Sequence, residues 1–352
     1  MTDQTMLDQT MLAAVLYGKE HLQIERIPVP AIGPGDILVR VRAALTCGTD
    51  LKVFRRGYHA RMIVPPAVFG HELAGDVVAV GDEVTRFVPG QRVVAANSAP
   101  CLHCFYCQRG RVNLCEDLLF NNGAYAEFIR IPARIVERNT HEIPPRLKYQ
   151  DAALAEPLAC VVKGLEDAGL EAGDTVAVIG AGPIGSMFVR LAKLRGAQVI
   201  AVGRGNKRLE HVLRLGADRI VATDDATNPV AAVRELTGGR GADIVIEAVG
   251  KPETWQWSVE MLRRGGVVNF FGGPPAGTRV DLDTNLLHYS EITCKASFHH
   301  TPRAFREALD IIEGGGIAAR DFVQAEEPLE SLSKVLFRLM EGSGALKTAI
   351  IP

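Results

Sequence analysis

Residues 175–196 read TVAVIGAGPIGSMFVRLAKLRG, and this stretch decides the fold. An apolar, β-branched run leads into a glycine-rich turn, and a segment long enough for a helix follows. Glycines spaced G-x-G-x-x-G in this context permit a tight turn, close approach of the backbone to a pyrophosphate, and close packing of helix on strand. A turn that binds nothing is the less favoured alternative. We therefore expect a dinucleotide site formed by Gly180, Gly182, Pro183, Ile184 and Gly185.

The chain that follows this turn repeats the alternation of strand and helix. Strand-like runs lie at 198–203, 218–223, 242–250 and 266–272, and we expect a further strand at 292–298. Segments long enough for helices separate most of these runs, as in parallel βαβ units. The pattern predicts an α/β fold with a doubly wound Rossmann domain built on a parallel sheet.

The first part of the chain has a different pattern. From Ala13 to about Pro145, short apolar runs are cut by Gly and Pro, which predicts a β-rich domain. No packing pattern is evident before Ala13. The tail contains two expected helices, 303–313 and 329–341, and a final apolar run that we expect to return to the β-rich part. The expected domains are a catalytic domain at 1–155, continued by 299–352, and a dinucleotide-binding domain at 156–298.

The choice of cofactor depends on the second strand of the nucleotide domain, which ends in QVIAVGRGNKR (198–208). At this place an acidic residue would accept hydrogen bonds from the ribose hydroxyls of NAD. Gly203 stands there instead, so no carboxylate repels a 2′-phosphate. The basic residues Arg204, Lys207 and Arg208 follow, which favours NADP. In the alternative interpretation they are only the solvated start of a helix, and NAD binds through its hydroxyls.

Four cysteines lie within one short stretch, with the spacing Cys101-x2-Cys104-x2-Cys107-x7-Cys115. A tight loop with four thiolates gives Zn²⁺ a closed tetrahedral shell, which is typical of a structural site. Disulfides would instead need an oxidising compartment, and the first residues lack a basic segment followed by an apolar one. We therefore expect a structural zinc ion and a cytoplasmic location.

Composition excludes several classes of partner. The formal net charge of −2 gives no electrostatic reason to expect nucleic acid or an anionic membrane surface as a partner. No apolar run approaches the ~20 residues that a membrane-spanning helix needs. A small molecule is the expected partner.

A second set of metal-ligand residues is spread over the β-rich part and its end. Cys47 follows a strand-like run in LTCGTD, and His71 and Glu72 lie in FGHELAG. Glu156 lies in LAEPLAC, where the β-rich part passes into the nucleotide domain. One thiolate, one imidazole and one or two carboxylates make a zinc shell that leaves room for water or substrate. Taken singly, each of these residues has an ordinary structural explanation.

These motifs together resemble the zinc-dependent medium-chain dehydrogenase/reductase family. The resemblance rests on the turn CGTD (47–50), the segment GHELAGDVVAVGDEV (70–84), the four-cysteine loop and GAGPIG (180–185). The Glu156-Pro157 pair resembles the polyol branch, which includes sorbitol and threonine dehydrogenases. The resemblance covers the chain from about Ala13 onward.

The resemblance implies a GroES-like catalytic domain, a Rossmann domain, and one catalytic and one structural zinc ion per chain. Cys47 and His71 would ligate the catalytic zinc, and either Glu72 or Glu156 would complete its shell, directly or through water. Thr49 matches the family's hydroxyl that passes the substrate proton outward, although it could simply satisfy a turn. Some members place a histidine two positions later as the outer end of this relay, where this chain has Leu51. Family members are commonly dimers or tetramers.

The sequence therefore predicts a zinc-dependent alcohol or polyol dehydrogenase that acts on a secondary alcohol or its ketone. Zinc would act as a Lewis acid on the substrate oxygen, and the nicotinamide would carry the hydride. One alternative is a threonine-type dehydrogenase of an amino alcohol. Another is a non-catalytic NADPH-binding protein, which the presence of all four metal-ligand residues disfavours.

Overall fold

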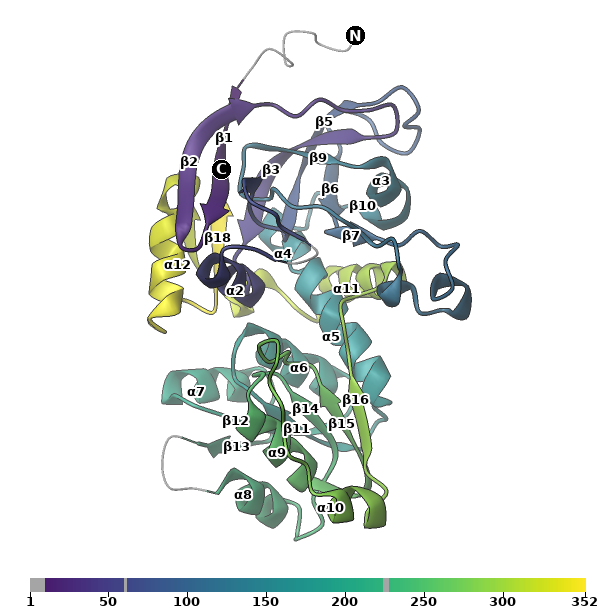
Figure 1. The fold of residues 1–352 in the computed structure, drawn as a ribbon, viewed down its shortest axis with the longest axis vertical. Helices are drawn as coiled ribbons and strands as arrows, with labels where there is room; N and C mark the ends of the chain where they lie inside the picture. Colours follow the sequence, from purple (N-terminus) through teal and green to yellow (C-terminus); the bar gives the residue numbers. More distant parts are fainter. Residues whose placement is uncertain (1–9, 60–61, 224–227) are drawn as a thin grey trace. The chain divides into compact units, whose positions relative to one another are not determined.

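The computed structural model describes residues 10–59, 62–223 and 228–352 (Figure 1). These residues form two units with separate cores. The first unit contains the described residues up to Ala159 together with His300–Pro352, and the second contains Cys160–His299. Helix α5 (Ala155–Ala168) begins in the first unit and ends in the second.

The second unit is built on a parallel sheet of six strands in the order β13-β12-β11-β14-β15-β16. In chain order this is 3-2-1-4-5-6, the arrangement of the dinucleotide-binding Rossmann fold, so the expected fold class is confirmed. The central strands β11 and β14 are buried along their whole length, because both faces of such a sheet are covered. The strands are β11 (Thr175–Ile179), β12 (Gln198–Gly203), β13 (Arg219–Ala222), β14 (Ala242–Glu247), β15 (Leu262–Phe270) and β16 (Thr293–Ala296).

Helices connect these strands in the positions that the alternation predicts. They are α6 (Pro183–Leu194), α7 (Asn206–Arg214), α8 (Pro229–Leu236), α9 (Pro252–Glu260) and α10 (Thr284–Tyr289). Proline at the start of α6, α8 and α9 suits a first helical turn, where its missing N–H has no partner to lose. Most of the apolar run 266–272 belongs to the inner strand β15, and its Val268 and Phe270 are buried in the core of this unit.

The first unit contains a larger mixed sheet in the order β10-β6-β5-β3-β18-β17, with β9 also paired to β3. The C-terminal strand β18 lies antiparallel to β3, with Ala349 opposite Leu45 and Ile350 opposite Ala44. The tail therefore belongs to this unit. The strands are β3 (Ile37–Leu45), β5 (Leu73–Val80), β6 (Arg92–Ala95), β9 (Phe128–Ile131), β10 (Thr140–Glu142), β17 (Val323–Pro328) and β18 (Lys347–Ile351).

Two small sheets and several helices complete the first unit. A sheet in the order β2-β1-β4 lies at the start of the described chain, and β7 pairs with β8 beside the four-cysteine loop. The strands are β1 (Thr10–Gly18), β2 (His21–Pro28), β4 (Ala67–Val68), β7 (Ser98–Ala99) and β8 (Leu119–Phe120). The helices are α2 (Gly48–Arg56), α3 (Ala133–Asn139), α4 (Tyr149–Ala153), α11 (Pro302–Glu313) and α12 (Leu332–Met340).

The structure corrects three details of the sequence interpretation. Strand β1 begins at Thr10 and already buries Met11, so packing starts before Ala13. Strand β2 was missed because its side chains alternate between exposed and half-buried, without an apolar run. The helix expected at 329–341 begins with a 3₁₀ turn, and α-helix starts only at Leu332. No helix among the described residues is long and apolar enough to cross a membrane.

Candidate functional site

Cys47 lies at the start of helix α2 in the first unit and acts as its N-cap. The backbone N–H of Cys47 donates to Asp50 Oδ2 at 3.0 Å, and the N–H of Thr49 points at Cys47 Sγ at 3.4 Å. The positive end of the helix therefore faces the sulfur atom. This arrangement also places the half-buried Thr49 next to the sulfur.

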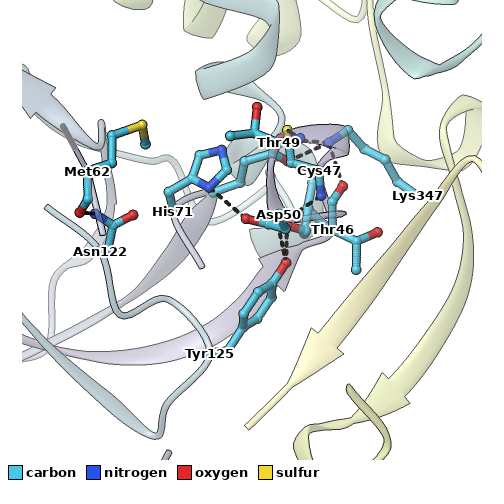
Figure 2. A network of polar contacts seen from close by, with 11 residues as sticks. Thr46, Cys47, Thr49, Asp50, Met62, His71, Asn122, Tyr125 and Lys347 are labelled. Carbon is cyan, nitrogen blue, oxygen red and sulfur yellow. Dashed lines mark hydrogen bonds and ion pairs between the residues drawn. The ribbon is translucent and has the colours of Figure 1, made fainter. Parts of the chain in front are cut away.

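His71 is held by a buried polar chain that runs through Asp50 to Tyr125 (Figure 2). The His71 Nδ1 atom lies 3.0 Å from Asp50 Oδ1, and the Tyr125 hydroxyl donates to Asp50 Oδ2 at 2.6 Å. Burial alone would lower the pKa of His71, but the Asp50 carboxylate raises it well above its usual value. Because Asp50 occupies Nδ1, the Nε2 atom of His71 is left for a metal ion.

Glu72 is paired with Lys347, a residue that the sequence analysis did not single out. The Lys347 ammonium lies 2.7 Å from Glu72 Oε1 and 2.6 Å from Oε2, and it also donates to the carbonyl of Thr46 at 2.9 Å. Both side chains are almost completely buried. A signal for Lys347 was present, because a lysine inside the apolar run ALKTAIIP needs a buried partner.

Glu156 lies in the first turn of α5 and is buried. Its Oε1 atom is 3.7 Å from Nε2 of the buried His300, which is itself 3.0 Å from Asn97 Oδ1. Burial raises the pKa of Glu156 to about 7, and burial lowers the pKa of His300 to about 3. His300 and Asn97 are thus further polar neighbours of the predicted site.

The donor atoms of three predicted residues fit a zinc ion. One ligand atom each from Cys47, His71 and Glu72 lie within 4.8 Å of one another, so that sulfur, nitrogen and oxygen donors are close together. Glu156 is not part of this close set. The second nitrogen of His71 is oriented by a carboxylate, as is typical of metal-ligating histidines. The chemistry of this donor set is that of a zinc site with an open position.

The four cysteines also fit a zinc ion. All four sulfur atoms lie within 4.8 Å of one another, and Cys104 Sγ is 3.9 Å from Cys115 Sγ. Zinc–sulfur bonds of ~2.3 Å place the sulfur atoms of a tetrahedron about 3.8 Å apart, whereas a disulfide would need ~2 Å. The N–H groups of Cys101 and Cys104 point at the sulfurs of Cys115 and Cys101, at 3.2 and 3.3 Å. These are the contacts expected of a closed thiolate site, which the sequence predicted at Cys101, Cys104, Cys107 and Cys115.

The glycine-rich turn of the second unit has the geometry of a phosphate-binding turn. Gly180 has φ +114°, in the region that favours glycine. A Cβ on Gly185 would lie 1.7 Å from the carbonyl oxygen of Gly180, so only glycine allows helix α6 to approach strand β11 so closely. The turn therefore leaves its backbone open to a pyrophosphate at the start of α6.

A cavity of about 280 Å³ lies at this end of the sheet. The predicted residues Gly180, Gly182, Gly203, Arg204 and Arg208 line it, whereas Pro183, Ile184, Gly185 and Lys207 do not. Residues that follow strand β14 form another wall, and the sequence analysis missed them. They include Lys251, Glu253, Thr254 and Trp257. The cavity and its bare glycine turn fit the adenosine half of a dinucleotide.

Comparisons with known families find matches in both parts of the chain. A family model described as "Alcohol dehydrogenase GroES-like domain" matches residues 33–145, and one described as "Zinc-binding dehydrogenase" matches residues 183–314. The chain is 33% identical to an L-threonine 3-dehydrogenase of Bacillus licheniformis, over 95% of this chain and 96% of the relative. It is 30% identical to a sorbitol dehydrogenase of Bacillus subtilis, over 98% of both chains.

Solved structures show the same fold. An alcohol dehydrogenase from Thermus sp. ATN1 is 32% identical with a TM-score of 0.88, over 97% of this chain and 99% of the other. A Sinorhizobium meliloti protein described as a zinc-binding dehydrogenase, solved with NADP bound, is 31% identical with a TM-score of 0.89, over 98% and 100%. The chain belongs to the zinc-dependent alcohol dehydrogenases of the medium-chain dehydrogenase/reductase family, enzymes that transfer a hydride between an alcohol and a nicotinamide cofactor.

Proposed function

We propose that this enzyme oxidises a secondary hydroxyl group of a polyol, or reduces the corresponding ketone, with NADP as its preferred cofactor. The observation that carries the proposal is the closeness of the Cys47 and His71 ligand atoms, which lie within 4.8 Å of each other, with the histidine oriented by Asp50. The first unit is then the catalytic domain, and the second unit is the nucleotide domain.

In this proposal Cys47 and His71 hold the catalytic zinc. The ion supplies a Lewis acid for the substrate oxygen. Asp50 fixes the ring of His71, so that one tautomer and one orientation are available. Thr49, beside the Cys47 sulfur, would relay the proton that the substrate hydroxyl loses, since its hydroxyl can accept this proton as it passes its own outward. Because Leu51 offers no acceptor, the proton leaves through water or the cofactor ribose.

We assign the carboxylate of the zinc shell to Glu156 rather than Glu72, directly or through water. Both oxygen atoms of Glu72 already face the Lys347 ammonium, which balances its charge and competes with a metal. The close polar neighbour of Glu156 is instead His300, whose Nε2 atom lies 3.7 Å from Glu156 Oε1. Glu72 then remains in its buried ion pair with Lys347, next to His71 in the chain, and does not bind the metal.

A panel of substrates tests the proposed activity. We expect turnover of polyols and simple secondary alcohols to exceed turnover of L-threonine by about 10-fold or more, a difference of ~1.4 kcal/mol in transition-state binding. The measurement is the initial rate of nicotinamide reduction with each substrate and each cofactor. L-Threonine is the necessary comparison, because relatives of 33% identity carry the name L-threonine 3-dehydrogenase. Preference for L-threonine would replace the polyol assignment, and no turnover at all would favour a binding protein.

Gly203→Asp is expected to reverse the cofactor preference. A carboxylate at this position repels a 2′-phosphate and removes the benefit of Arg204, so we expect the NADP-to-NAD ratio of kcat/KM to fall about 10- to 100-fold, ~1.5–3 kcal/mol. Gly203→Ala is the matched control, since a Cβ there would lie 3.0 Å from Ala181 Cβ and tests crowding without charge. An unchanged ratio in the Asp variant would show that this position does not select the cofactor.

We also infer a cytoplasmic location and a homodimer or homotetramer. The cysteines, all of which lie among the described residues, form no disulfide there, and four of them are gathered in one loop, which suits a reducing compartment. The exposed edge strand β16, rather than the buried run in β15, is the surface that an association through the sheet would use.

A further inference from the structure

One wall of the nucleotide cavity is formed by residues that follow strand β14. It carries charged side chains to which hydride transfer assigns no role. Lys251 precedes helix α9, and Glu253 lies in the first turn of that helix. Both residues line the cavity together with Arg204 and Arg208, which come from the end of β12 and from α7. Charged residues from separate segments of the Rossmann unit therefore share one cavity.

Glu253 lies between two of these cations. Its Oε1 atom is 3.5 Å from Lys251 Nζ and 3.7 Å from Arg204 Nη2. All three side chains are about half exposed, so the pairs are weak and can exchange partners with solvent or with a ligand. Glu253 lies in the first turn of α9, where the positive end of the helix dipole favours an anion.

The charged side chains that line the cavity have an excess of positive charge. Three cations, Arg204, Arg208 and Lys251, line the cavity with the single carboxylate of Glu253, which leaves a net charge of +2 in this set. A phosphate monoester carries about −1.5 to −2 at neutral pH. Its oxygen atoms can accept hydrogen bonds from several cations at once, whereas one carboxylate must be shared between two.

We propose that Lys251 completes the site for the 2′-phosphate of NADP, and that Glu253 is an internal counter-ion which the phosphate displaces. The inference rests on the proposed NADP preference and extends it to the second wall of the cavity. With NAD bound, Glu253 stays paired with Lys251 and Arg204. With NADP bound, the phosphate takes both cations, and the displaced carboxylate lowers the affinity through its own negative charge. Glu253 thus limits the preference for NADP.

Binding measurements on the zinc-loaded full-length enzyme test this arrangement. Dissociation constants for NADP and NAD are measured by titration calorimetry for the wild type, Lys251→Gln and Glu253→Gln. We expect Lys251→Gln to weaken NADP binding about 10-fold and Glu253→Gln to strengthen it about 3- to 10-fold, because charge-assisted contacts to phosphate are lost or released. NAD binding is expected to change less than about 2-fold in both variants, and the NADP effects should shrink in high salt.

Glu260→Gln is the matched control for Glu253→Gln, because it makes the same change of charge at the other end of α9. It should leave both constants unchanged. Adenosine 2′-monophosphate serves as a second probe, since it carries the phosphate without the nicotinamide half, and its binding should follow that of NADP.

The outcomes separate this inference from the cofactor preference itself. If the wild type prefers NADP but Lys251→Gln binds it as tightly as before, the role of Lys251 is wrong and the preference stands. If Glu253→Gln weakens NAD instead of strengthening NADP, Glu253 is a ribose acceptor and the counter-ion role is wrong. If the wild type binds NAD more tightly and neither variant changes NADP, both proposals are overturned.

Discussion

Cys47→Ser is expected to remove the catalytic zinc and almost all activity. The serine oxygen cannot replace a thiolate in a shell that also uses His71 Nε2, so the Lewis acid is lost. We expect kcat/KM to fall about 10⁴-fold, which corresponds to ~5 kcal/mol of transition-state stabilisation. The zinc content should fall from about two ions per chain to about one, because the four-cysteine site is left intact. Both quantities are measured on the same preparation, by metal analysis and by initial rates.

Cys294→Ser is the control for this substitution. It makes the same atomic change at an exposed cysteine of strand β16, outside both metal-ligand sets. It should keep about two zinc ions and normal turnover. If Cys47→Ser kept both ions and its activity, the catalytic zinc would have to lie elsewhere in the chain.

Lys347→Met is expected to destabilise the protein by about 3–5 kcal/mol, because removal of one partner leaves the buried carboxylate of Glu72 without its cation. Methionine keeps most of the volume of the lysine stem, so the loss reports charge rather than a cavity. The measurement is the free energy of unfolding in urea, with zinc present. The double variant Glu72→Gln/Lys347→Met should recover a large part of the loss, since no buried charge then remains.

The pH dependence of this variant has a definite sign. Burial already raises the pKa of Glu72, and the positive charges of Lys347 and His71 oppose that effect. Without Lys347 the pKa of the folded state rises further, so the folded state binds a proton that the unfolded state releases. The loss of unfolding free energy caused by Lys347→Met should therefore grow as the pH rises above the ordinary pKa of a glutamic acid, ~4.3, and shrink at acid pH. A defect that is independent of pH, or a double variant no more stable than Lys347→Met, would contradict the buried-pair explanation.

Most of the features that the sequence predicted are built from residues that lie close together in the chain. The spacing of the four cysteines and of the G-x-G-x-x-G turn is local; the four sulfur atoms lie close together, and Gly180 and Gly182 line the nucleotide cavity. The parallel, doubly wound character of the second sheet followed from the alternation of strands with helices, whereas the strand order came from the structure. Cys47, His71 and Glu72 come from two separate segments, and they could be selected together because their residue types suit a zinc shell and match the family's motifs.

The parts that the sequence did not predict depend on contacts between distant segments. Lys347 is 275 positions from Glu72, and only the pairing of β18 with β3 brings the two together. Lys251 and Glu253 reach the nucleotide cavity because β14 lies beside β11 in the sheet, which no local pattern near Gly180 indicates. Strand β2 has no apolar run, so its sequence resembles a loop.

The placement of β18 between β3 and β17 determines the order in which the two sites of the newly made chain can form. Domains generally fold during synthesis in the order in which they leave the ribosome. The nucleotide unit, Cys160–His299, can assemble while the tail is still being translated. The sheet that supports Cys47 and His71 stays incomplete until residues 347–351 emerge, and so does the charge balance of Glu72. During translation, the nucleotide unit should therefore be able to bind its cofactor before the metal centre of the first unit is finished.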